Sequence, residues 1–160
     1  MRYLSRLILL LCWALWFGGL IALMLGVMSI FKEFGGDRLT AGRATAAFFR
    51  AWGFYELVVA AGVLVGAAAV RLLMPSKLAT FLFLLLALSA VLAVVTTGFL
   101  MPRLEELRIA GEQSTAEFRS LHGRANAMFM GRTVLLFVGG LMLPAVLQTN
   151  RREAVNSASN

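Results

Sequence analysis

The chain has 160 residues, of which 60% are hydrophobic and only 14% are charged, and its mean hydropathy is +0.83. Soluble domains carry about 25% charged residues, so this composition excludes an ordinary soluble domain and predicts an integral membrane protein. A net charge of +7 could indicate nucleic-acid binding, but the basic residues are scattered at loop ends without an aromatic-basic surface. We therefore expect anionic lipid head groups, and no nucleic acid, as the partner of these charges.

Four apolar runs are each long enough to cross a bilayer, which requires about 20 apolar residues per helix. The sequence predicts an all-α integral membrane protein, a four-transmembrane-helix bundle that forms one domain over residues 1–148. The predicted spans are residues 7–31, 53–73, 78–100 and 126–147, and residues 149–160 are expected to form a loose polar tail. Amphipathic interfacial segments are expected in the two long loops.

The first span follows a basic amino terminus. A secretory signal would give the same pattern, but no small-x-small cleavage site follows the run. Gly18, Ala22 and Gly26 are spaced by four, which predicts a narrow face on which another helix can approach closely. Trp13 and Trp16 lie too deep for an interfacial belt, so they are expected to fill the space between helices.

The first loop, from Lys32 to about Trp52, is first polar and then amphipathic, so it lies at the head groups or runs directly into the second span. Within that span, Gly62 and Gly66 form a second close-packing pair. Glu56 lies one turn inside the span, and two alternatives remain open for it. Its side chain snorkels to water, or it pairs with a cation from a neighbouring helix.

A short turn at residues 74–77 makes the second and third spans antiparallel neighbours. The third span has no charge at its centre, and Ser89, Thr96 and Thr97 can each bond the backbone of their own helix. Pro102 then fits the first position of a new short helix, which we expect to lie on the membrane surface.

A capping box formed by Ser114 and Glu117 predicts that the last helix begins in water. A charge in hydrocarbon costs about 2.5–3.5 kcal/mol. We therefore predict that Glu56 and Arg132 face the bundle interior, and that one of them meets His122 or the opposite member. The ionisable and amide side chains near the membrane face at which the last span begins form a candidate polar cluster: Glu56, Arg119, His122, Asn126 and Arg132.

Short motifs at the ends of the predicted spans carry a resemblance to a known family. In chain order they are Trp16–Gly19, Ala41–Gly42, Phe48–Arg50 with Tyr55, Pro102, and Phe118–Gly123. By their order, the sequence resembles the small four-span membrane proteins that share the domain of unknown function 4149, similar to the transmembrane protein 205-like group. The resemblance implies no established reaction. Relatives tend to have a serine three residues after the histidine, where this chain has Ala125.

Soft-metal binding is a further possibility that the sequence raises, because thioethers suit Cu(I) and one branch of that family is associated with resistance to platinum drugs. The candidate ligands are His122, Asn126, Glu56, Met24, Met28, Met101, Met128 and Met130. Methionine is also a common gap filler in packed interiors, and the last two sulfurs point apart on a helix. A single histidine leaves only a His/Met arrangement for haem. We expect no resident metal and no cofactor.

Catalytic patterns are not found in the sequence: it offers no nucleophile–base pair, no facing carboxylates and no phosphate-cradling loop. We therefore predict a non-enzymatic protein without catalytic residues. His122 is then a capping or interfacial side chain.

Two functional classes remain. The favoured one is a structural or accessory subunit in a membrane assembly, with the bilayer and other membrane subunits as partners. The alternative is transport or handling of a small solute or a soft, copper-like metal, through a vestibule at one membrane face lined by Glu56, His122, Asn126 and Arg132. Transport normally requires polar groups near the midplane, whereas here the ionisable residues gather near one face, which favours the accessory role.

The orientation rests on basic residues. Their total favours the long loops as cytoplasmic, whereas the amino terminus and the short turn at residues 75–77 are purely basic and favour cytoplasmic termini. We predict a multi-pass protein of a bacterial inner membrane with its termini in the cytoplasm.

Overall fold

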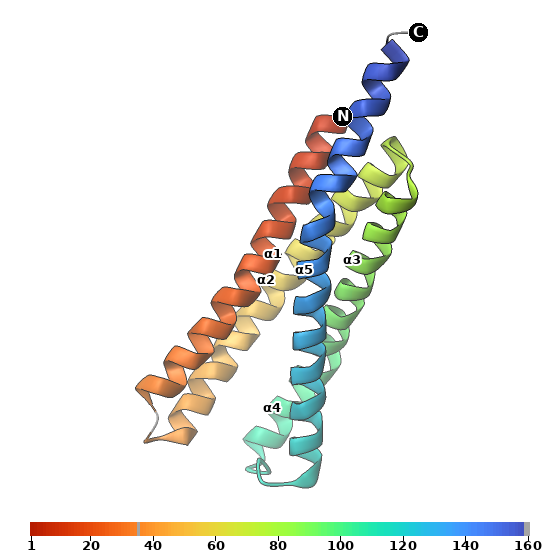
Figure 1. Cartoon of the computed structure of the whole chain (residues 1–160). Helices are drawn as coiled ribbons and strands as arrows, with labels where there is room; N and C mark the ends of the chain where they lie inside the picture. The colour runs from red at the N-terminus through yellow and green to blue at the C-terminus, as the bar shows by residue number, and fades with distance from the viewer. Residues whose placement is uncertain (35, 159–160) are drawn as a thin grey trace.

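The computed structural model describes residues 1–34 and 36–158, and every regular element in this part of the chain is helical. The elements are α1 (Arg2–Glu33), α2 (Arg38–Leu73), α3 (Lys77–Val95), the π-helix η1 (Thr96–Leu100), α4 (Met101–Ile109) and α5 (Ala116–Ala158). Since α3, η1 and α4 follow one another without a break, the chain forms four long rods (Figure 1). All four are long and apolar enough to cross a membrane, which defines a multi-pass membrane protein.

The rods form two hairpins. α1 packs mainly on α2, α3 packs on both α2 and α5, and α1 and α5 touch much less. Figure 1 shows the two hairpins close together near the chain termini and diverging toward the α1–α2 connection and α4. We call these parts the terminal half and the loop half.

Glycines bring α1 and α2 together in the terminal half. A Cβ atom on Gly66 would lie 2.8 Å from the backbone nitrogen of Leu9, and one on Gly62 would lie 2.7 Å from the Cys12 sulfur. Only a residue without a side chain allows backbones to come this close. The predicted pair Gly62 and Gly66 therefore lies directly on the α1–α2 interface.

The predicted packing face of α1 is wrong for two of its three residues. A Cβ atom on Gly18 would have no neighbouring atom within 4 Å, and Ala22 is exposed. The face toward α2 runs instead through Gly19, against the rings of Trp52 and Tyr55, and through Gly26, against Phe48. Adjacent helical residues differ by about 100°, so a shift of one residue turns the predicted stripe outward.

The first loop is shorter than predicted, because α2 begins at Arg38 and runs directly into the second span. Its first turn is capped by Asp37, whose Oδ1 accepts hydrogen bonds from the backbone nitrogens of Leu39 and Thr40, both at 3.0 Å. Of the two alternatives for this segment, the continuous helix is correct.

The ends of α5 also differ from prediction. The hydroxyl of Thr115, not Ser114, accepts from the Phe118 nitrogen at 3.2 Å, and Glu117 forms an ion pair with Arg103 at 2.8 Å. The predicted capping box is therefore wrong. The expected loose tail is wrong for residues 149–158, since α5 continues to Ala158, and residues 159–160 lie outside the described residues.

Pro102 stands in the first turn of α4, directly after the π-helix. The Met101 nitrogen donates to the Thr96 carbonyl, a wider turn than that of an α-helix. Because proline has no N–H and its ring crowds the preceding turn, this widened turn lets the helix continue through Pro102. The sequence predicted a new short helix here, but not its continuity with the third span.

Candidate functional site

A buried ion pair joins the two hairpins. Arg132 on α5 and Glu56 on α2 are each 1% exposed, and the Arg132 Nε lies 3.1 Å from the Glu56 Oε1. Two indoles also donate to this carboxylate: Trp16 on α1 to Oε1 at 2.8 Å, and Trp52 on α2 to Oε2 at 3.2 Å. Of the two alternatives for Glu56, snorkelling is wrong and pairing with a cation from a neighbouring helix is correct.

The ion pair lies within the apolar part of its helices, on the side of the loop half. At a rise of 1.5 Å per residue, it is roughly 10 Å along the helix axis from Arg50 on α2 and from Arg124 on α5. Beyond the pair, α2 carries no further charge until Arg71. A charge pair at such a depth is costly to desolvate and is normally functional in membrane proteins.

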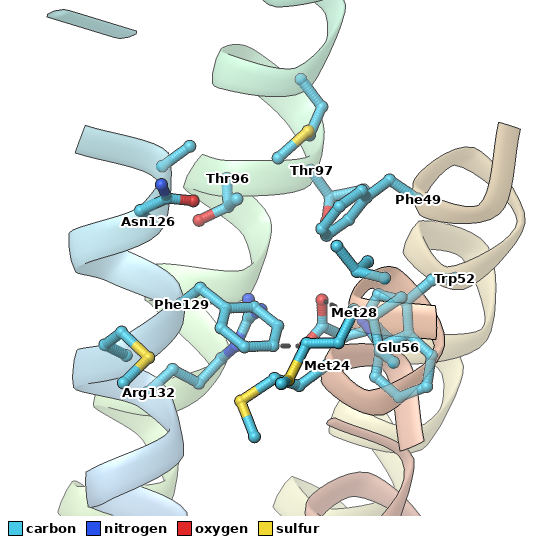
Figure 2. Close-up of a pocket in the computed structure, with 15 residues that line it drawn as sticks. Met24, Met28, Phe49, Trp52, Glu56, Thr96, Thr97, Asn126, Phe129 and Arg132 are labelled. Carbon is cyan, nitrogen blue, oxygen red and sulfur yellow. Dashed lines mark hydrogen bonds and ion pairs between the residues drawn. The ribbon is translucent and has the colours of Figure 1, made fainter. Parts of the chain in front are cut away.

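A cavity of about 320 Å³ lies on the loop side of the ion pair (Figure 2). We call this cavity the vestibule. Residues of α1, α2, η1, α4 and α5 line it, with Glu56, Arg132, Asn126, Thr96 and Thr97 as its polar members. Its apolar wall is made mainly of sulfur-containing and aromatic side chains: Met24, Met28, Met101, Met130, Phe49, Trp52 and Phe129.

The two sides of the vestibule differ. Just beyond it, α2 and α4 are tied by Glu105, which pairs with Arg50 at 2.6 Å and with Arg108 at 2.5 Å. Arg108 Nη1 also donates to the Gly42 carbonyl at 2.9 Å. We call Arg50, Glu105 and Arg108 the latch.

The opposite side of the vestibule, between α1 and α5, is bordered by flexible apolar side chains. Met24, Met28 and Met130 are 38%, 62% and 56% exposed. The hydrogen bond between α1 and α5, from Trp13 Nε1 to the Leu136 carbonyl at 2.9 Å, lies beyond the ion pair in the terminal half. The vestibule is thus bordered on this side by exposed apolar residues of two helices that are long and apolar enough to cross a membrane.

Arg132 is incompletely satisfied. Its Nε and Nη1 atoms are buried and find no aligned hydrogen-bond acceptor in the described part of the chain, and its Cζ lies 5.4 Å from the centre of the Phe129 ring. In Figure 2 the side chain reaches from α5 toward Glu56 along the inner end of the vestibule. Two indole N–H groups and the Arg132 Nε therefore lie around a single carboxylate, and the guanidinium, which has five N–H groups, has donors left without an acceptor.

The structure divides the candidate polar cluster. Glu56 and Arg132 meet, as predicted, and Asn126 lines the same vestibule. Arg119 and His122 do not join them, so this part of the prediction is wrong. Both are exposed: His122 stacks on Phe118 with ring centres 6.0 Å apart, and Arg119 donates to the Ser114 carbonyl at 2.7 Å. Along the helix, His122 lies three residues and Arg119 six residues before Ala125, the first residue of α5 that lines the vestibule.

The candidate metal ligands are divided as well. Four methionines line the vestibule, but Met128 instead accepts a weak contact from the Thr96 hydroxyl at 3.8 Å. Among the described residues, no three His, Cys, Asp or Glu side chains lie close enough together to hold a metal ion.

The sequence interpretation missed the two tryptophan donors. Trp52 lies one helical turn before Glu56, a spacing that places both on one face, so this contact had a local signal. Trp16 comes from another helix, and its partner depends on how α1 is rotated. The sequence placed it between helices but not on the carboxylate.

Comparison of the chain with protein-family models, curated proteins and solved structures finds no match. The fold and the site themselves define the class: a multi-pass helical membrane protein with a buried ion pair at the inner end of a vestibule. Its resemblance to the four-span family stays a prediction.

Proposed function

We propose that the protein is a non-enzymatic membrane protein that binds a small, largely apolar solute in the vestibule. The observation that carries this proposal is a cavity of about 320 Å³ that ends on the buried Glu56–Arg132 pair. Ligand sites are typically mostly apolar cavities of about 300–1,000 Å³ with a few convergent polar groups. This proposal corresponds to solute handling, one of the two functions that the sequence left open. It differs in that His122 does not line the vestibule.

The packing beyond the ion pair supports handling at one membrane face. Leu9, Val59, Ala93 and Leu136 come from the four rods and are all buried there. Their close packing favours a site that loads and unloads on the side of the loop half over a continuous aqueous path. Soft-metal handling has less support, because His122 and Met128 lie outside the vestibule.

Photoaffinity labelling tests the proposal. An alkyl diazirine probe is added to the full chain in lipid nanodiscs, irradiated, and mapped by mass spectrometry. Labelling is expected to concentrate on Met24, Phe129 and Met130, and Ala125→Trp is expected to reduce it, because Ala125 is a buried lining residue. The matched control is Ala22→Trp on the exposed face of α1, which should leave vestibule labelling unchanged. Equal labelling of outward residues such as Leu141 would contradict the proposal.

An accessory subunit is the second candidate function. The observation that favours it is the outward position of Gly18 and Ala22, which leaves small residues on the surface of α1 where a helix of another subunit could approach closely. Copurification in mild detergent tests this role. A partner that is retained by the natural chain and lost in Gly18→Leu would support it, whereas the same partner retained in both would place the contact elsewhere.

For orientation, we propose a bacterial inner membrane with both termini in the cytoplasm. Both ends of the chain lie at the terminal half (Figure 1), where the amino terminus and the turn at residues 75–77 carry basic residues without acids. Fusions of a cytoplasmic and a periplasmic reporter at the carboxyl end test this. Activity of the periplasmic reporter would reverse the orientation.

A further inference from the structure

We infer that the vestibule takes a lipid-soluble compound with an uncharged carbonyl group, and that Arg132 donates a hydrogen bond to that carbonyl oxygen. This inference rests on the proposed function and specifies its ligand. It follows from the balance of hydrogen-bond donors at the inner end of the vestibule, from the net charge there, and from the apolar border between α1 and α5.

Donors exceed acceptors at the ion pair. The Glu56 carboxylate already accepts hydrogen bonds from the indoles of Trp16 and Trp52, and it faces the Arg132 Nε. Arg132 Nη1, in a side chain that is 1% exposed, has no hydrogen-bond partner in the described residues. Buried hydrogen-bond donors normally have an acceptor, and a buried donor without one lowers stability. The complementary ligand group is therefore an oxygen acceptor.

The charge of the site favours an uncharged acceptor. With both groups ionised, Glu56 and Arg132 sum to zero, and no other ionisable residue lines the vestibule among the described residues. An anionic ligand would bring an uncompensated charge beside the Glu56 carboxylate in a medium that solvates charge poorly. A ketone, quinone, ester or amide oxygen can accept from the guanidinium without adding charge.

The walls favour an apolar body on that carbonyl. Phe49, Phe129 and the four lining methionines surround most of the space, and methionine adapts to ligands of differing shape. The border formed by Met24, Met28 and Met130 is exposed, on two helices that are long and apolar enough to cross a membrane. We infer that the compound enters sideways from the membrane between α1 and α5.

The experiment compares a medium-chain methyl ketone with the matched carboxylate and the matched alkane, each brominated at the far end of the chain. Binding to the full chain in a maltoside detergent, which has no carbonyl group, is followed by quenching of indole fluorescence. The ketone is expected to bind about tenfold more tightly than the alkane, the effect of one charge-assisted hydrogen bond, and more tightly than the carboxylate. Its C=O stretching frequency should fall on binding.

Two variants separate the hydrogen bond from the charge. Glu56→Gln leaves the positive charge of Arg132 unbalanced, so the preference is expected to reverse toward the carboxylate. The double variant Glu56→Gln with Arg132→Met removes both charges and keeps an acceptor for the two indoles. It should bind ketone and alkane equally, without a shift of the C=O stretch. Arg119→Gln is the control, because Arg119 is exposed outside the vestibule.

The outcomes distinguish the inference from the proposed function. If ketone, carboxylate and alkane bind the natural chain equally, the vestibule binds apolar chains but the carbonyl inference is overturned. Tightest binding of the carboxylate, or an unshifted C=O stretch for the bound ketone, would also overturn it. If none of the three quenches fluorescence or competes with the diazirine probe, the proposed function itself fails.

Discussion

The terminal half and the loop half join the same four rods in different ways. In the terminal half, Gly62, Gly66 and Gly140 let neighbouring helices come into direct contact with α1. In the loop half, long side chains span the space between the hairpins, through the ion pair and the latch. Lipid supplies little hydrophobic drive for helix association. Close contact therefore depends on small residues, and polar bridges can hold helices together while leaving room for a ligand.

The largest expected effect comes from breaking the ion pair. Arg132→Met leaves the Glu56 carboxylate buried without its cation, which should lower the free energy of unfolding by about 3–5 kcal/mol. Thermal or detergent-induced unfolding of the purified chain measures this. The double variant with Glu56→Gln should recover most of the loss, because no buried charge remains.

The control for this prediction is Arg71→Met, since Arg71 is exposed and its Cζ lies 5.4 Å from the centre of the Phe83 ring. An exposed cation–π contact contributes about 0.5–1 kcal/mol. If Arg132→Met were no more destabilising than Arg71→Met, the ion pair would not be the main link between hairpins in the loop half.

The terminal half should respond to a single methyl group. In Gly66→Ala the new Cβ would lie 2.8 Å from the Leu9 nitrogen and 2.9 Å from its Cα. Backbone atoms cannot rotate away, so α1 must shift, and we expect a loss of about 1–3 kcal/mol in unfolding free energy. Gly18→Ala is the matched control in open space. Because alanine favours a helix over glycine, it should be neutral or stabilising by about 0.5–1 kcal/mol. Equal effects would contradict the contact.

The sequence predicted the features that depend on a single helix or on charge, and it missed those that depend on how several helices pack. Four spans follow from apolar run length, and the meeting of Glu56 with Arg132 follows from the cost of isolated charge in lipid. The packing face of α1 depends on helix rotation, where one residue separates Gly18 from Gly19. The vestibule depends on how far the hairpins diverge, a property of all four rods together. Periodicity within any one helix carries no such information.

The latch should affect spacing more than stability. Glu105→Gln removes two ion pairs whose members are partly or largely exposed, so we expect a loss below about 1 kcal/mol. Of the contacts between α2 and α4 in the latch, only the hydrogen bond from Arg108 to the Gly42 carbonyl would remain. The distance between spin labels at the exposed positions Leu39 and Ile109 should therefore broaden toward longer values. Double electron–electron resonance spectroscopy measures the distribution of this distance.

Glu106→Gln is the matched control for the latch. Glu106 pairs with Arg103 within α4 at 3.0 Å and therefore does not link the hairpins. An unchanged distance distribution in Glu105→Gln, or the same broadening in both variants, would show that the latch does not set the width of the loop half.

The smallest expected effect is at the start of α2. Hydrogen bonds from the side chain and backbone of Thr40 are the largest causes that lower the pKa of Asp37 below its ordinary value. A carboxyl whose folded-state pKa is lowered stabilises the fold above its unfolded-state pKa, and this contribution is lost as the pH falls through the folded-state value. We therefore expect Asp37→Asn, which keeps a helix cap, to make the unfolding temperature slightly less dependent on pH in the range below about pH 4.

Asp37→Ala should also lower that temperature at neutral pH, because it removes the cap. If Asp37→Asn left the acid slope unchanged, the titration in this range would belong to other carboxyl groups. The cap would then fix the entry of α2 into the loop half without making it sensitive to acid.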